Sequence, residues 1–166
     1  MSSPVAVRDA TAADAPAVTA IYNAGIDSRQ ATFETQHRTA DDMRDRIAAT
    51  AERHAFLVAE VDGAVVGWAA TFPYSARPAY DGVAEYSVYV DPSAQGCGIG
   101  RALLATLLDR ARASGLHKVT SRVFPENTAS LALAERLGFR VVGTHVRHAR
   151  LDGAWRDVVT VEALLG

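Results

Sequence analysis

Several protein classes are excluded by what this chain lacks. A single cysteine, Cys97, leaves no partner for an internal disulfide, so we expect a reducing, cytoplasmic environment. The apolar runs are far shorter than a membrane span, and the segment Met1–Pro4 lacks the basic and apolar regions of a signal peptide. Lysine and arginine number 17 against 19 acidic residues, so no basic excess indicates nucleic-acid binding. We therefore expect neither a membrane nor a nucleic-acid partner.

What the chain does have is enough apolar sequence for one sizeable core. Hydrophobic residues make up 49% of its 166 residues, which suits a single domain over 1–166. Periodicity and turn signals predict strands over 5–8, 56–61, 64–69, 83–90, 118–124, 141–149 and 158–164, and helices over 11–22, 39–53, 99–114 and 127–137. Residues 23–38 are predicted to be irregular. The order predicts one α/β domain of the α+β type, with helices around one sheet.

The most informative segment is Gln95–Gly100, which lies between an apolar strand, Tyr86–Val90, and a predicted helix. Such a junction presents free backbone N–H groups and the positive end of a helix dipole, so it suits a pyrophosphate. A P-loop needs Lys-Ser/Thr after its last glycine, where this chain has Arg101, and the G-x-G-x-x-G dinucleotide pattern is not met. A plain strand-to-helix turn also uses glycine, so the loop alone leaves that alternative open.

The pattern that remains, Gln-x-x-Gly-x-Gly, resembles the acyl-CoA pyrophosphate loop of the GNAT N-acyltransferase superfamily. A second segment, Asn127–Ser130 leading into Glu135–Phe139, is similar to that superfamily's other cofactor segment. The resemblance covers nearly the whole chain. It implies a single mixed, mostly antiparallel central sheet flanked by helices. It also implies acetyl-CoA as co-substrate, no metal, and a homodimer.

Four further segments resemble one branch of the superfamily, the phosphinothricin and methionine sulfoximine N-acetyltransferases. They are Ile21–Asn23, Ala31–Thr35, Arg77–Asp81 and Glu85–Val90, and the last two carry the most specific signal. The resemblance implies transfer of an acetyl group to the amine of a small amino-acid-like substrate such as phosphinothricin or methionine sulfoximine. It also implies a role in herbicide or antibiotic resistance.

The same resemblance implies which residues hold acetyl-CoA. A strand contributes backbone groups to the pantetheine and the thioester carbonyl, and the glycine loop binds the pyrophosphate. The implied cofactor-binding residues are Val88, Tyr89, Val90, Gln95, Gly96, Cys97, Gly98, Ile99, Gly100, Arg101, Asn127 and Ser130. Core packing of the strand side chains and solvation of the arginine are the alternatives. A helix N-terminus lowers the pKa of a thiol, but no base lies nearby in the sequence, so we do not expect the cysteine to be a nucleophile.

Acceptor chemistry is implied for a second set of residues. Glu85 is the expected general base, acting through water, because desolvation of a carboxylate raises its pKa toward the working range. Arg77 is expected to grip an acidic group of the acceptor, because a guanidinium binds carboxylate or phosphinate bidentately. Phe33, Tyr80, Tyr86 and Ser87 are expected to line the same pocket. A solvated glutamate, an exposed loop arginine and core aromatics are the alternatives.

Two details depart from a simple assignment. Many GNAT enzymes carry a tyrosine, and this branch often a histidine, where this chain has Ala134, so the group that protonates the leaving thiolate is absent. His145 and His148 lie on a predicted strand, where alternation would place them on opposite faces. No further ligand at a recognised spacing completes a site, so we expect no metal there.

Other functions remain open at this point. One is a non-catalytic acyl-CoA-binding module, which Ala134 favours slightly. Another is a GNAT enzyme for a different small amine. Aminoglycosides and polyamines would prefer an acidic pocket, against which Arg77 argues.

Overall fold

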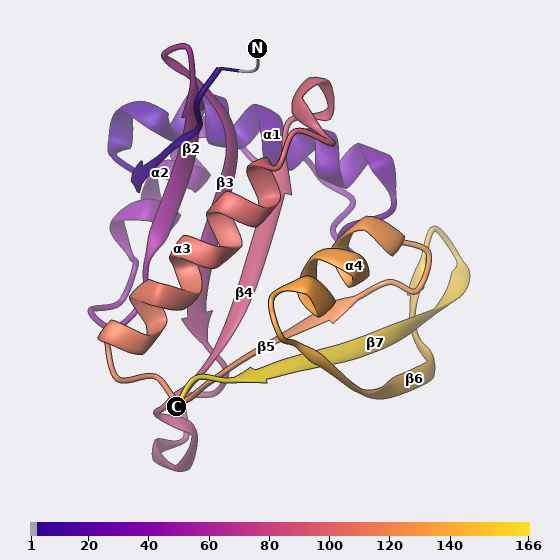
Figure 1. Cartoon of the computed structure of the whole chain (residues 1–166). Helices are drawn as coiled ribbons and strands as arrows, with labels where there is room; N and C mark the ends of the chain where they lie inside the picture. The colour runs from indigo at the N-terminus through magenta and orange to yellow at the C-terminus, as the bar shows by residue number, and fades with distance from the viewer. Residues whose placement is uncertain (1–2) are drawn as a thin grey trace.

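The computed structural model describes residues 3–166, which form one seven-stranded sheet with four α-helices (Figure 1). The strands are β1 Ala6–Asp9, β2 Phe56–Val61, β3 Ala64–Pro73, β4 Val83–Val90, β5 Lys118–Val123, β6 Arg140–Leu151 and β7 Ala154–Leu164. The α-helices are α1 Ala15–Ser28, α2 Ala40–Ala48, α3 Ile99–Ala113 and α4 Thr128–Arg136. Short 3-10 helices cover Ala12–Asp14, Pro78–Tyr80 and Pro92–Ala94.

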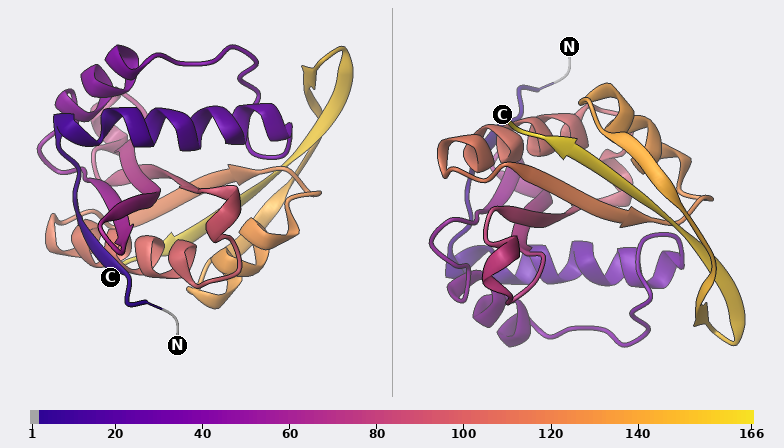
Figure 2. Two further views of the ribbon diagram at one scale, coloured as in Figure 1. Left: turned by 90° about the horizontal axis from the view of Figure 1, so that it is seen from above. Right: turned by 90° about the horizontal axis from the view of Figure 1, so that it is seen from below.

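The sheet is mixed, with the strand order β1-β2-β3-β4-β5-β7-β6. Among the described strands, β4 and β5 run parallel and every other neighbouring pair is antiparallel. Helices α1 and α2 cover one face, and α3 and α4 cover the other (Figure 2). The predicted fold class, a mostly antiparallel sheet flanked by helices, is confirmed.

Strands β4 and β5 separate soon after they meet. Their pairing covers only Val83–Glu85 against Lys118–Thr120. One residue further, the Ser121 hydroxyl donates to the Tyr86 carbonyl at 3.1 Å. On its other side β4 pairs with β3 over Ala84–Val90. Beyond Tyr86 one edge of β4 is therefore free, and a gap opens in the middle of the sheet.

Each face of the sheet has its own apolar core. Under α1 and α2 the fully buried Trp68 stacks with its ring centroid 5.0 Å from that of Phe56 and 4.9 Å from that of Tyr89. On the other face, Leu103 and Leu107 lie one helical turn apart on α3 and are buried, as the sequence period predicts. Packing of this apolar stripe fixes α3, and with it the glycine loop at its N-terminus.

Some element boundaries were predicted wrongly. α1 continues to Ser28, into the segment predicted to be irregular, because Ile26 is fully buried against the sheet. Arg29 then ends the helix in the left-handed conformation, with φ 57°. α2 ends at Ala48 and not near residue 53, since 49–53 contain no large apolar side chain to pack. β6 and β7 are each longer than predicted and meet at a tight turn.

The strand faces predicted for the two histidines of β6 were also wrong. His145 and His148 do not lie on opposite faces, because their rings stack with centroids 4.3 Å apart. The pairing register shifts between His145 and Ala149, and Arg147 takes a positive φ of 49°, so a bulge interrupts the strand alternation. Within residues 3–166 no group of three or more His, Cys, Asp or Glu is placed to hold a metal ion. No helix in that same range is long and apolar enough to cross a membrane.

Candidate active site

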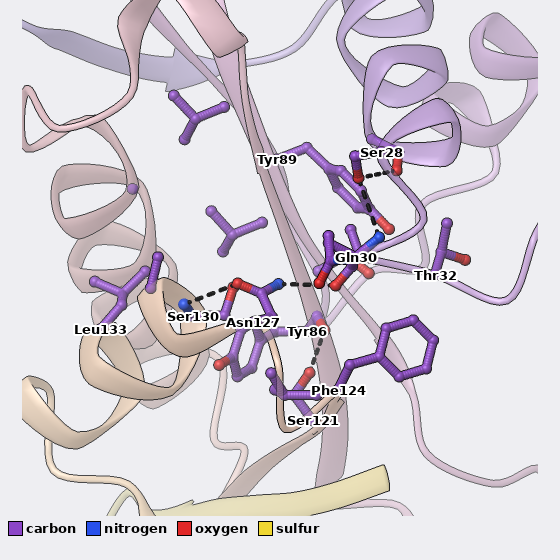
Figure 3. Close-up of a pocket in the computed structure, with 18 of the residues that line it drawn as sticks. Ser28, Gln30, Thr32, Tyr86, Tyr89, Ser121, Phe124, Asn127, Ser130 and Leu133 are labelled. Atoms are coloured by element: carbon purple, nitrogen blue, oxygen red, sulfur yellow. Dashed lines mark hydrogen bonds between the residues drawn. The ribbon is translucent and has the colours of Figure 1, made fainter. Parts of the chain in front are cut away.

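A cavity of about 810 Å³ lies where β4 and β5 separate. It is bounded by the free edge of β4, the glycine loop with the start of α3, the start of α4, and the loop between α1 and α2. Figure 3 shows Gln30 and Thr32 of that last loop on one side and Ser130 and Leu133 of α4 on the other. Four separate parts of the chain therefore meet around one cavity.

The free edge of β4 directs backbone groups into this cavity. Asp91, directly after the strand, donates its N–H toward β3 at 2.8 Å. Backbone groups alternate along a strand, so those of Val90 and Val88 point away from β3. The same alternation places the Tyr86 carbonyl on the β5 side, where Ser121 donates to it. Because β5 has diverged beyond that point, the N–H groups of Val88 and Val90 are available to a ligand.

The glycine loop ends in a helix N-terminus that faces the same cavity. Gly96 and Gly98 have φ values of 78° and 79°, a conformation that costs about 1–2 kcal/mol for a residue with a Cβ. Gly98 is the N-cap of α3, and the first N–H groups of the helix have no helical acceptor. Arg101 and Arg136 also line the cavity and add positive charge. This end suits a pyrophosphate.

Asn127 connects α4 to the loop on the far side of the cavity. Its Oδ1 accepts the N–H of Ser130 at 3.2 Å and so caps α4, as the sequence predicts. Its Nδ2 donates to the Gln30 carbonyl at 3.2 Å (Figure 3). The second predicted cofactor segment is thus held against the loop that follows α1.

Glu85 is the carboxylate of β4 beside the cavity. Its side chain is 13% exposed, and its Oε1 lies 3.3 Å from Nη2 of Arg122 on β5. Burial raises the pKa of Glu85 above its ordinary value, and the positive charge of Arg122 opposes that rise. A carboxylate with a raised pKa is a stronger base than one in water.

Strand alternation divides the predicted acceptor residues between two faces. Glu85 and Ser87 project toward α1 and α2, whereas Tyr86 projects toward α3 and α4. The ring of Tyr86 packs edge-on to Phe139 at 5.2 Å, and burial raises the pKa of its phenol to about 12. Tyr86 and Ser87 both line the cavity, but they form different walls of it.

An aromatic side chain lies beside Glu85 on the same face of the sheet. Phe72 is its cross-strand partner on β3. The guanidinium of Arg46 lies 5.8 Å from the Phe72 ring centroid and 5.3 Å from that of Trp68. Across the cavity, Phe33 of the α1–α2 loop meets Phe124 edge-on at 4.8 Å. The end of the cavity near the carboxylate therefore combines apolar walls with a small number of charged groups.

Most of the residues predicted for the site line this one cavity. They are Phe33, Glu85, Tyr86, Ser87, Val88, Tyr89, Val90, Gln95, Gly96, Gly98, Ile99, Gly100, Arg101, Asn127 and Ser130. Cys97 is exposed on the glycine loop and is not among the lining residues. Arg77 and Tyr80 belong to the short helical segment before β4 and also lie outside the lining, with Tyr80 packed against Tyr74 at 5.3 Å. Their place in the acceptor pocket stays a prediction.

The sequence prediction missed several residues of the lining. Arg46, Phe72, Arg122 and Phe124 all line the cavity, and of these Phe72 and Arg122 lie beside Glu85. Strand alternation gives the face of each strand residue, but only the pairing of β4 with β5 brings Arg122 next to Glu85. No local motif marks these positions.

Comparison with known proteins places the chain in a family. The family model of the Acetyltransferase (GNAT) family matches residues 19–139. The chain belongs to the GNAT acetyltransferase family. The phosphinothricin N-acetyltransferase of Streptomyces viridochromogenes is 37% identical to this GNAT protein over 155 residues, which are 93% of this chain and 85% of the relative. The L-methionine sulfoximine/L-methionine sulfone acetyltransferase of Pseudomonas aeruginosa is 33% identical over 161 residues, 94% of this chain and 92% of the relative.

The fold agrees with solved GNAT structures. The structure of yncA from Salmonella typhimurium, with its cofactor acetyl-CoA, matches this GNAT acetyltransferase with a TM-score of 0.95 at 31% identity, covering 99% of this chain and 95% of that one. The chain is thus an acetyl-CoA-dependent acetyltransferase. Its cavity fits that co-substrate, because the helix N-terminus and Arg101 suit the pyrophosphate and the free edge of β4 suits the pantetheine amides.

A Cys97→Ala variant is expected to keep the kcat of the wild type. The thiol is exposed on the loop, outside the cavity lining, and it donates a weak hydrogen bond to the Gln95 carbonyl at 3.7 Å. Thiol release from saturating acetyl-CoA measures the effect. A variant that is inactive under those conditions would show that Cys97 takes part in the reaction.

Proposed function

We propose that this GNAT acetyltransferase transfers the acetyl group of acetyl-CoA to the amine of a small amino-acid-like acceptor such as phosphinothricin or methionine sulfoximine, with Glu85 as general base. The observation that carries the proposal is the position of Glu85. It lies on the cavity, mostly buried, on the strand whose free edge carries the N–H groups of Val88 and Val90. The names of the similar proteins support this class of acceptor.

Each group around Glu85 has a defined task in this proposal. Acetyl-CoA supplies the acetyl group as a thioester. Glu85 accepts a proton from the acceptor ammonium, directly or through water, and so leaves a free amine. The N–H of Val88 or Val90 donates to the carbonyl oxygen where negative charge develops, as a single oxyanion donor. Phe72, the cross-strand partner of Glu85, adds an apolar wall beside the carboxylate.

The leaving thiolate has no dedicated acid at position 134. Ala134 is fully buried in α4 and has no acidic proton. A thiol has a pKa near 8.5, so its thiolate is a tolerable leaving group near neutral pH and water can protonate it. We therefore propose direct transfer that requires Glu85 and does not require a side-chain acid at this position.

A second copy of the chain is the proposed partner. β6 is an edge strand, and Val141, Val142 and Val146 on it are exposed, as is Trp155 on β7. Exposed apolar side chains grouped on one edge of a sheet favour association. These residues are therefore the expected homodimer surface.

Thiol release from acetyl-CoA tests the proposed function. The panel contains phosphinothricin, methionine sulfoximine, ordinary amino acids, and amines without a carboxylate. Release with amino-acid-like acceptors supports the proposal. If no compound of the panel gives thiol release while calorimetry shows that acetyl-CoA binds, the result would contradict this acceptor class and favour a different amine.

A further inference from the structure

The ion pair between Glu85 and Arg122 lies at the acceptor end of the cavity and joins a mostly buried carboxylate to an exposed guanidinium. Glu85 is 13% exposed and fixed on β4, whereas Arg122 is 61% exposed on β5. Both residues line the cavity. Arg122 makes no other ion pair among the described residues and no side-chain hydrogen bond there, so most of its donors remain available. The cavity therefore presents one anionic and one cationic group side by side.

The spacing of this pair matches the charges of an α-amino acid. Glu85 Oε1 and Arg122 Nη2 are 3.3 Å apart, which is comparable to the separation of the ammonium nitrogen and a carboxylate oxygen on one α-carbon. When these two charge pairs lie antiparallel, the ammonium meets the glutamate and the carboxylate meets the guanidinium. Both contacts between the enzyme and the amino acid then join opposite charges. Arg122 can use two parallel N–H donors toward the carboxylate.

Other charged groups at the cavity are placed less well for this task. The ionisable side chains that line it besides this pair are Tyr22, Glu34, Arg46, Tyr86, Tyr89, Arg101, Arg136 and His148. Arg46 lies over the rings of Trp68 and Phe72, and Arg101 lies in the first turn of α3 near the glycine loop. Arg122 is the cation in direct contact with the proposed base.

We propose that the Glu85–Arg122 pair recognises the α-ammonium and α-carboxylate of a free amino acid, with Arg122 as the residue that binds the acceptor carboxylate. This inference rests on the proposed function and makes it more specific. It predicts that acceptors without a carboxylate beside the amine are poor substrates. Peptide N-termini and polyamines belong to that group, because they leave Arg122 without an anionic partner.

The test compares one amino acid with its α-carboxamide. L-methionine sulfone and L-methionine sulfone amide differ at the carboxyl group alone. We expect Arg122→Gln to lower kcat/KM for the acid roughly 10- to 100-fold and to change the amide value less than about threefold. Arg122→Lys keeps the positive charge but lacks the two parallel N–H donors of a guanidinium. It is expected to recover part of the lost kcat/KM for the acid. Every enzyme is assayed with the same two compounds. The difference in chemical reactivity between the acid and the amide therefore cancels when the variants are compared with the wild type.

Two comparison variants complete this test. Arg112→Gln removes an exposed arginine of α3 that pairs with Asp109 outside the cavity, and it should leave both acceptors unchanged. Arg77→Gln removes the loop arginine that the sequence suggested for the same role. If the preference for the acid disappears in Arg77→Gln and persists in Arg122→Gln, the assignment to Arg122 is wrong.

A pH profile separates recognition from a merely structural role. Arg122 opposes the rise in the pKa of Glu85, so Arg122→Gln is expected to move the acidic limb of kcat/KM to higher pH, while Arg122→Lys leaves it nearly in place. The proposal is wrong if the acidic limb of kcat/KM stays in place in both Arg122 variants while both still prefer the acid to the amide.

Failure of the proposed function gives a different result. In that case wild-type enzyme releases no thiol with any amino acid. The acid and the amide are then compared by calorimetric binding with CoA present. Equal affinity of the wild type for the two compounds would contradict the role of Arg122 whether or not acetyl transfer occurs.

Discussion

Glu85→Gln is expected to lower kcat roughly 10²- to 10⁴-fold and to leave the Kd for acetyl-CoA unchanged. Glutamine keeps the size of the side chain and a carbonyl oxygen that can accept from Arg122, but it cannot take a proton from the acceptor ammonium. The carboxylate lies beside the acceptor end of the cavity, and the pyrophosphate is expected at the distant glycine loop. Thiol-release kinetics and calorimetry measure the two quantities.

The pH dependence gives a second measure of the same residue. A general base acts when it is deprotonated, so kcat/KM rises with pH through the pKa of Glu85 in the free enzyme. Burial raises that pKa, so the acidic limb is expected above the ordinary range of a glutamate and should be absent in Glu85→Gln. Glu126→Gln, which removes an exposed carboxylate outside the cavity, is the matched control. A Glu85→Gln enzyme with full kcat would exclude Glu85 as the base.

Trp68→Ala is expected to lower the free energy of unfolding by about 3–5 kcal/mol. The indole is fully buried between Phe56 and Tyr89, so its removal leaves a cavity that the paired strands cannot close. Since small domains are stable by only about 5–15 kcal/mol, this is a large share of the total. Urea unfolding followed by circular dichroism measures the change.

Trp155→Ala is the matched control for this prediction. Trp155 is 52% exposed on β7, where the Arg150 guanidinium lies 4.3 Å from its ring centroid. Its removal is expected to cost less than about 1 kcal/mol, as for an exposed cation–π contact. Equal losses for the two variants would mean that burial does not set the contribution of Trp68. If unfolding of the wild type depends on protein concentration and that of Trp155→Ala does not, Trp155 takes part in a homodimer.

Local signals in the sequence were enough for the elements that carry the cofactor site. Glycines that need positive φ mark the loop at Gly96 and Gly98, and the apolar period of α3 fixes which side of that helix is buried. The side chain of Asn127 caps α4 as expected. These signals act over a few residues and depend on backbone sterics and periodicity, so a single sequence reveals them.

The β6 bulge and the end of α1 were harder to predict from the sequence. The predicted opposite faces of His145 and His148 were wrong because a bulge interrupts β6, and no residue pattern marked that bulge. The extension of α1 to Ser28 depends on burial of Ile26 under the helix, which is a tertiary contact. The second case shows packing overriding a local expectation.

By itself the sequence determined the family resemblance, the order of the elements, the glycine loop and the candidate base. Only the tertiary structure decided that β4 and β5 separate after Glu85, which opens the cavity and frees the N–H groups of Val88 and Val90. It also decided that Arg122, 37 positions further along the chain, contacts Glu85, while Arg77, much closer in sequence, lies outside the cavity lining. The physical reason is that hydrogen-bonded pairing between distant strands sets these contacts, and such pairing is not encoded in any short segment.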